Sequence, residues 1–87
     1  MKKINVTIID PVGLHARPAS VVVQAANEFE SDITIKNGSH EGNLKSIMNV
    51  MAMQISEGTN IDIIANGSDE EKAIEKLNEV LKTNKLI

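Results

Sequence analysis

The sequence has 87 residues, no cysteine, a single aromatic residue and a formal net charge of −3 at pH 7. The absence of cysteine excludes disulfides and thiolate metal sites, and an acidic chain with almost no aromatic side chains is unsuited to binding nucleic acid. A chain of this length forms one domain, which we expect to span residues 1–87 and to be cytoplasmic.

The N-terminal segment has the alternation of a half-buried strand. Lys2 and Lys3 resemble the basic start of a signal peptide, but the apolar segment from Ile4 to Ile9 is too short to be one. We therefore expect no membrane insertion. Apolar residues at every second position predict a strand here, and they are Ile4, Val6 and Ile8.

The segment from Gly13 to Ser20, with the sequence GLHARPAS, joins this strand to a helix. Gly13 permits a tight turn, and Pro18 falls in the first helical turn, where a missing N–H costs nothing. His15 is therefore expected at or beside the N-cap. The helix is predicted from apolar residues at helical spacing, which are Ala19, Val22, Val23, Ala26 and Phe29.

This junction has the chemistry of an anion site that contains a nucleophile. The unpaired N–H groups of Ala16 and Arg17 are expected to point at the space before the helix, where the helix dipole favours an anion. The forked guanidinium of Arg17 can pair two phosphate oxygens, and a histidine such as His15 is partly neutral and nucleophilic near pH 7. No carboxylate lies closer in sequence than Asp10 to activate water. The segment predicts reversible carriage of a phosphoryl group rather than its hydrolysis.

The middle of the chain predicts a hairpin followed by a short helix. Ile33 and Ile35 mark a strand, Asn37-Gly38 is the two-residue turn, and residues 39–43 form a weak returning strand. Ser46 is then expected to cap a short apolar helix that continues to about Met53.

The last third predicts one more strand and one more helix. The strand runs from Asn60 to Ala65 and is closed by Asn66-Gly67, and Ser68 with Glu71 predicts a capping box at the helix start. The helix has one apolar stripe, formed by Ala73, Ile74, Leu77, Val80 and Leu81. The order βαββαβα predicts an α+β fold, with a four-stranded antiparallel sheet that three helices cover on one face.

Two motifs, Gly13 to Ser20 and Asn43 to Met48 (NLKSIM), closely resemble the HPr family, the histidine-containing phosphocarrier proteins of the bacterial sugar phosphotransferase system. The resemblance covers essentially the whole chain and implies an open-faced β-sandwich. It implies that His15 accepts a phosphoryl group, on the ring nitrogen nearer the backbone, from enzyme I, which draws on phosphoenolpyruvate. His15 then passes the group to sugar-specific IIA components, and Ala16 and Arg17 stabilise the phosphate. Such a protein is a stoichiometric carrier and not an enzyme, with no cofactor.

Ser46 has two interpretations that are compatible with each other. A serine at a helix start is a good cap in any protein, and its side chain then accepts a backbone hydrogen bond. The resemblance adds that in HPr proteins of Gram-positive-type bacteria the matching serine is phosphorylated with ATP by HPr kinase/phosphorylase. The added charge at Ser46 would leave the fold intact and change the surface that enzyme I or a catabolite-control regulator meets.

The short helix is also expected to carry a partner surface. Helical spacing brings Ile47, Met48 and Met51 together as a soft apolar patch, which we expect to lie beside His15, whereas Met53 is expected to fill the core. Two positions depart from the pattern of the HPr family, since many members have glycine where this chain has Asn49 and Gln54. These departures affect the regulatory side of the surface and leave the acceptor motif unchanged.

Three alternatives remain open beside the carrier hypothesis. A regulatory protein that acts mainly through Ser46 is one, although HPr-like relatives of that kind replace the histidine that His15 matches. A carrier for a nitrogen-related phosphotransfer chain is another, although those relatives generally lack the Asn43 to Met48 pattern. A metal site at His15 and His40 is the third, and the sequence offers no further ligands to complete it, so we expect no metal. Nothing indicates an oligomer, and we expect a monomer.

Overall fold

The alternating and helical patterns of the sequence correspond to four strands and three helices in a computed structural model that describes residues 1–87. The strands are β1 (Lys2–Thr7), β2 (Asp32–Asn37), β3 (His40–Asn43) and β4 (Asn60–Asn66). The helices are α1 (Ala16–Ala26), α2 (Ile47–Ala52) and α3 (Glu70–Thr83). None of these helices has both the length and the hydropathy that crossing a membrane requires.

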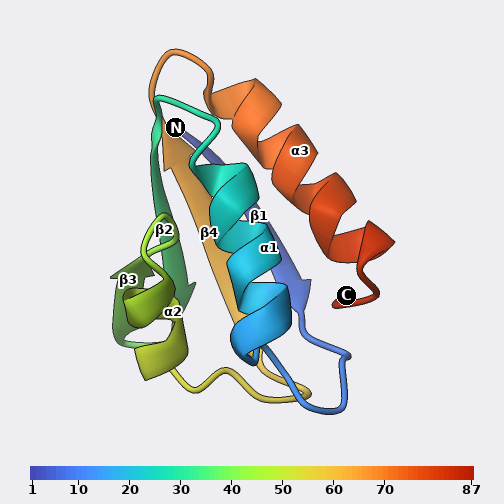
Figure 1. The fold of residues 1–87 in the computed structure, drawn as a ribbon. Helices are drawn as coiled ribbons and strands as arrows, with labels where there is room; N and C mark the ends of the chain where they lie inside the picture. The colour runs from blue at the N-terminus through green and yellow to red at the C-terminus, as the bar shows by residue number, and fades with distance from the viewer.

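The strands form one antiparallel sheet in the order β1-β4-β2-β3. Figure 1 shows α1 and α3 side by side across one face of this sheet, with α2 beside β3. The predicted α+β fold, an open-faced sandwich with helices on one face, is therefore confirmed. The buried core lies between the two layers and includes Ile33, Ile35, Ile61 and Ile63 from the sheet and Val22, Leu77 and Leu81 from the helices.

The hairpin between β2 and β3 turns one residue later than the sequence predicts. Asn37 pairs with His40 across the two strands, so the loop residues are Gly38 and Ser39 rather than Asn37 and Gly38. Gly38 has a φ of +61°, whereas Ser39 is not among the residues with positive φ. Glycine at the first loop position alone is the pattern of a type II′ turn, which leaves Asn37 free to extend the ladder.

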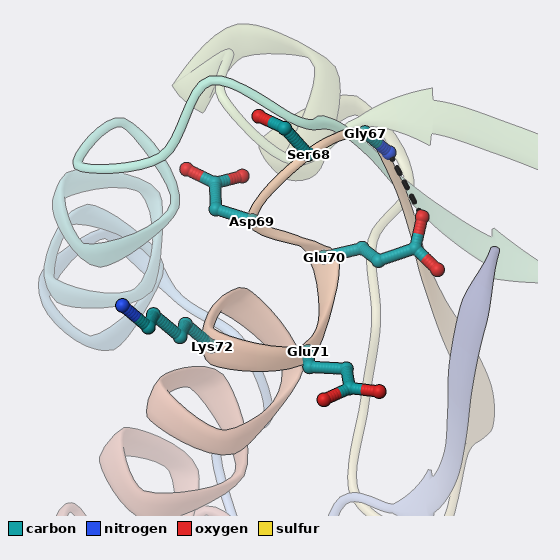
Figure 2. Close-up of a pocket in the computed structure, with 6 residues that line it drawn as sticks. All are labelled: Gly67, Ser68, Asp69, Glu70, Glu71 and Lys72. Atoms are coloured by element: carbon teal, nitrogen blue, oxygen red, sulfur yellow. Dashed lines mark hydrogen bonds between the residues drawn. The ribbon is translucent and has the colours of Figure 1, made fainter.

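The predicted capping box of α3 is wrong. The N-cap is Asp69 instead of Ser68, and the helix begins at Glu70. Glu70, not Glu71, turns back toward the chain that enters the helix, and its Oε1 accepts a hydrogen bond of 3.1 Å from the N–H of Gly67. Figure 2 shows this bond, with the side chains of Ser68 and Glu71 well apart from each other.

The reason for this shift is a tertiary contact of Asp69. Its carboxylate accepts hydrogen bonds from the N–H groups of Glu30 (2.9 Å) and Ser31 (3.0 Å) and from the hydroxyl of Ser31. Ser31 is buried in the turn between α1 and β2, so this contact joins that turn to the start of α3. The helix start is set by a partner far away in the sequence.

Helix α1 is shorter than its apolar pattern suggests. It ends at Ala26, and Phe29 packs against the core from the turn that follows. The side-chain amide of Asn27 donates to the carbonyl oxygens of Val23 and Lys45, at 2.9 and 3.0 Å, and thereby ties the end of α1 to the segment before α2. The carbonyl oxygen of Val23 also accepts from the N–H of Asn27, so the side-chain amide adds a second donor at the end of the helix and a link to Lys45.

Candidate functional site

A tight turn precedes α1. Asp10 holds it twice, because its carbonyl oxygen accepts from the N–H of Gly13 at 2.9 Å and its Oδ1 accepts from the N–H of Val12 at 2.8 Å. Gly13 has a φ of +78°, and a Cβ atom there would lie 2.3 Å from the carbonyl oxygen of Ile55. That same oxygen accepts from the N–H of Leu14 at 2.9 Å. The turn therefore fixes the point at which the next residue enters the helix.

His15 is the N-cap of α1, as the sequence predicts. Its carbonyl oxygen accepts the first helical hydrogen bond, from the N–H of Ala19 at 2.9 Å, but its side chain makes no capping hydrogen bond. The N–H groups of Ala16 and Arg17 have no acceptor within the protein, and both residues are exposed. Two unpaired amides therefore stand at the helix start beside an imidazole whose ring nitrogens are free of backbone contacts.

The imidazole faces an open depression of about 280 Å³. Arg17 contributes the only cationic side chain to its lining, and it has no carboxylate partner, because the ion pairs of the protein are Met1 with Glu70 and Lys2 with Glu71. An anion in the depression would thus meet a guanidinium that is not already neutralised. The lining residues are Asp10, His15, Arg17, Pro18, Val21, Asn84 and Leu86.

Among these lining residues, Val21 on α1 was not found from the sequence, and neither were Asn84 and Leu86. Asn84 and Leu86 follow α3 and reach the depression because the carbonyl oxygen of Leu86 accepts a hydrogen bond of 2.8 Å from the N–H of Ile9. Leu86 is buried, at 1% exposure. The one available signal in the sequence was that Leu86 is apolar and follows Leu81 by five positions. That signal did not indicate which part of the fold Leu86 would pack against.

Ser46 is the N-cap of α2, and this prediction is confirmed. Its Oγ accepts hydrogen bonds of 3.2 Å from both the backbone N–H and the side-chain amide of Asn49. The Oδ1 of Asn49 accepts in turn from the N–H of Asn43 at 3.1 Å. Asn49 therefore fixes the half-buried serine hydroxyl through two donors, where a glycine would supply one.

The apolar residues of α2 and of its C-cap, Met53, divide between surface and core as predicted. Met48 is 78% exposed, with Ile47 at 38% and Met51 at 40%, whereas Met53 is half-buried against the core. Helix α2 flanks α1 (Figure 1), and the segment that follows it meets the turn before α1 through the bond between Leu14 and Ile55. The apolar patch and the turn before α1 are therefore joined by a short segment that is hydrogen-bonded to that turn.

A second hollow lies at the start of α3 and is separate from both histidines. It has a volume of about 400 Å³ and is lined by residues 67–72 (Figure 2). Its carboxylates are used structurally, since the N-terminal amino group lies 2.6 Å from Glu70 and its hydrogen bond lowers the pKa of that carboxyl group. No group of three or more side chains that could hold a metal ion occurs in the structure.

Comparison with known proteins gives one consistent result. Residues 2–83 match the family model described as the PTS HPr component phosphorylation site. The chain is 51% identical over 87 residues to the phosphocarrier protein HPr of Mycoplasma capricolum subsp. capricolum. This alignment covers 100% of this chain and 98% of that relative. It is 46% identical over 88 residues to the phosphocarrier protein HPr of Mycoplasma pneumoniae, with 100% of both chains covered. A solved histidine-containing phosphocarrier protein of Mycoplasma superposes with a TM-score of 0.97 at 50% identity, over 99% of this chain and 98% of that one.

Proposed function

Because the chain belongs to the HPr family, the phosphocarrier proteins of the phosphotransferase system, we propose that His15 is its phosphoryl acceptor. Phosphorylated enzyme I donates the group, and sugar-specific IIA components receive it. The observation that supports this most strongly is the position of His15, which caps α1 with a free side chain and faces an open depression beside an unpaired Arg17.

The residues around His15 are suited to hold a phosphoryl group. The N–H groups of Ala16 and Arg17 are unpaired, and at a helix start they meet an anion together with the positive end of the helix dipole. The guanidinium of Arg17 can pair two of the phosphoryl oxygens. Charge stabilisation from these groups favours acceptance, while the bond from phosphorus to nitrogen stays available to the next acceptor.

The site is suited to carry the group rather than to hydrolyse it. Asp10 is the one carboxylate that lines the depression, and its Oδ1 already accepts from the N–H of Val12. The depression therefore offers water a single candidate base, and the backbone of its own turn already engages one oxygen of that carboxylate. An exposed acceptor in a shallow depression can be presented to successive partner active sites, which supply the rest of the chemistry.

Acceptance can be measured with enzyme I and labelled phosphoenolpyruvate. We expect the parent protein to take up acid-labile, base-stable label and His15→Ala to take up none, since phosphohistidine is the product. His40→Ala is the matched control, because it removes the other histidine, which is exposed on β3, and it should label like the parent. Label on His15→Ala, or none on the parent beside a competent enzyme I, would contradict the proposal.

We also propose that the exposed patch of Ile47, Met48 and Met51 is the docking surface for these partners. Flexible thioether side chains adapt to partners of different shape, as a carrier that meets both donor and acceptor requires. The exposure of all three residues and the position of α2 along α1 support this assignment.

Regulation through Ser46 is a further part of the proposal. Phosphorylation by HPr kinase/phosphorylase with ATP would place about −1.5 to −2 charges next to the docking patch. A catabolite-control regulator would recognise the phosphorylated serine through that charge, and enzyme I would be repelled by it. The capping bonds of the Ser46 hydroxyl support a position at which added charge leaves the fold intact.

The effect of this charge can be tested with Ser46→Asp. We expect it to accept phosphate from enzyme I more slowly than the parent, because the aspartate sets a negative charge and its hydration shell against the partner. Ser46→Asn is the control, since asparagine also caps a helix but carries no charge, and it should accept at the parental rate. Equal rates for Ser46→Asp and Ser46→Asn would exclude electrostatic blocking.

A further inference from the structure

Asp10 has a structural task that uses only part of its side chain. Its backbone oxygen and its Oδ1 hold the turn by accepting from Gly13 and Val12. This is the arrangement in which an aspartate or asparagine side chain mimics a backbone turn, and it requires one acceptor oxygen but no charge. The negative charge of Asp10 is therefore not needed for the turn.

The charge of Asp10 is also not neutralised. The ion pairs of the protein involve Glu70 and Glu71 only. Asp10 is half-buried and lines the same depression as His15, and the remaining lining, apart from Arg17, is uncharged. The acceptor histidine thus faces one cation and one anion that do not pair with each other.

We propose that the carboxylate of Asp10 destabilises the phosphoryl group on His15 and thereby favours its departure, in opposition to Arg17. The inference rests on the proposed function of His15 as the acceptor. A phosphoryl group carries nearly two negative charges near neutral pH, and like charges across an exposed depression repel each other to an extent that salt reduces. Arg17 favours loading, and Asp10 keeps the loaded group easy to release.

The chemical steps can be followed without a protein donor. Phosphoramidate transfers its phosphoryl group to the ring nitrogen of His15. The bond from phosphorus to the leaving ammonia breaks as the bond to the imidazole forms, and ammonia takes the ring proton. Water later attacks phosphorus, the bond to the ring nitrogen breaks, and the ring regains a proton as inorganic phosphate leaves. The rate of this second step measures the stability of the loaded state.

The test compares the half-life of the phosphohistidine in the parent and in Asp10→Asn, followed by phosphorus NMR at low and at high salt. Asparagine keeps an Oδ1 acceptor for Val12 and removes the charge. Glu41→Gln is the control for net charge, since Glu41 is exposed on β3 and does not line the depression. If Asp10→Asn does not fold, Asp10→Ser, whose hydroxyl can form a similar turn, replaces it.

We expect the half-life at low salt to be about threefold to tenfold longer in Asp10→Asn than in the parent, as repulsion between charges that line one water-exposed depression implies. The difference should shrink in 1 M salt, where screening acts over about 3 Å, and Glu41→Gln should match the parent. Equal half-lives, or a difference that salt leaves unchanged, would overturn the inference about Asp10 but would leave the proposed function of His15 intact. Failure of both phosphoramidate and enzyme I to label His15 would instead contradict the proposed function.

Discussion

Gln54 adopts a backbone conformation that its side chain makes unfavourable. Its φ is +50°, and it directly follows Met53, the C-cap of α2. Residues after a helix end often take this left-handed conformation, and glycine is preferred there because a Cβ atom crowds the backbone. The sequence places Gln54 where many HPr proteins have glycine, and the structure supplies the physical reason for that preference.

We expect Gln54→Gly to raise the free energy of unfolding by about 1 kcal/mol, because relief of the strained φ exceeds the added freedom of the unfolded chain. Urea denaturation measures this change. Gln24→Gly is the matched control, because Gln24 lies within α1 and is exposed. The same substitution there should lower stability by about 0.5 kcal/mol. A loss of stability at both positions would contradict the assignment of strain at Gln54.

Gly13 is the residue on which the turn before α1 depends most. We expect Gly13→Ala to lower the free energy of unfolding by roughly 2–4 kcal/mol, since it combines a positive φ with a clash against backbone. Gly38 has a similar φ, +61°, but no atom within 4 Å of an added Cβ, so Gly38→Ala should cost only about 1 kcal/mol. Thermal and urea denaturation of the pair separate the two contributions. Equal costs would show that the contact with Ile55 is easily relieved.

At the scale of elements, the contact between Asp69 and the turn at Ser31 couples stability to pH. Hydrogen bonds from the Ser31 hydroxyl and from the N–H of Glu30 lower the pKa of the Asp69 carboxyl group. A carboxyl group whose pKa is lower in the folded state stabilises the fold fully above its unfolded pKa. That stabilisation is lost as the pH falls through the folded pKa.

We therefore expect stability to fall in acid partly through Asp69, below about pH 4, the usual range of an aspartate. Asp69→Asn should be less stable than the parent at neutral pH and should lose less stability on acidification. Asp32→Asn, an exposed change nearby in the sheet, should show the parental pH dependence. The free energy of unfolding, measured by urea denaturation at several pH values, checks this. Identical acid losses in the parent and in Asp69→Asn would exclude the contact as the cause.

These elements also show how far the sequence determines the fold. The number, order and type of the elements follow from alternation and helical spacing, which are local patterns, and they were predicted. The start of α3 was not, because Asp69 is fixed by Ser31, 38 positions away. The hairpin turn was misplaced by one residue, because the pairing of Asn37 with His40, rather than the Asn-Gly preference, sets it. At the start of α3 a tertiary contact overrides the local signal, whereas at the hairpin the positive φ of Gly38 at the first loop position decides between two local alternatives.

At the scale of the whole molecule, the candidate site combines three parts of the chain, namely Asp10 in the turn, the start of α1, and the segment after α3. His15, Ala16 and Arg17 lie in one segment, so their positions at the helix start were predictable from local sequence. Asn84 and Leu86 come from beyond α3, and they join the site only because the chain after α3 returns to bond with Ile9. No local sequence pattern predicts that the segment after α3 folds back to Ile9. For this reason Arg17 and His15 were found from the sequence, whereas Asn84 and Leu86 were not.

The whole molecule also has the shape that carriage requires. One face of the sheet is covered by helices (Figure 1), and the proposed acceptor His15 stands at the start of α1 in an open depression, with the apolar patch on the neighbouring helix α2. A partner can therefore approach the acceptor and the patch without entering a cavity. Donor and acceptor proteins are expected to use this surface in turn.

The central claim is that His15 both receives and passes on the phosphoryl group. The most direct measurement is the relay of label from phosphoenolpyruvate through enzyme I and this protein to a sugar-specific IIA component. We expect label on the IIA component only when the parent protein is present, and none when His15→Ala replaces it. Label that reaches this protein but never the IIA component, or that reaches it through His15→Ala, would contradict the carrier role.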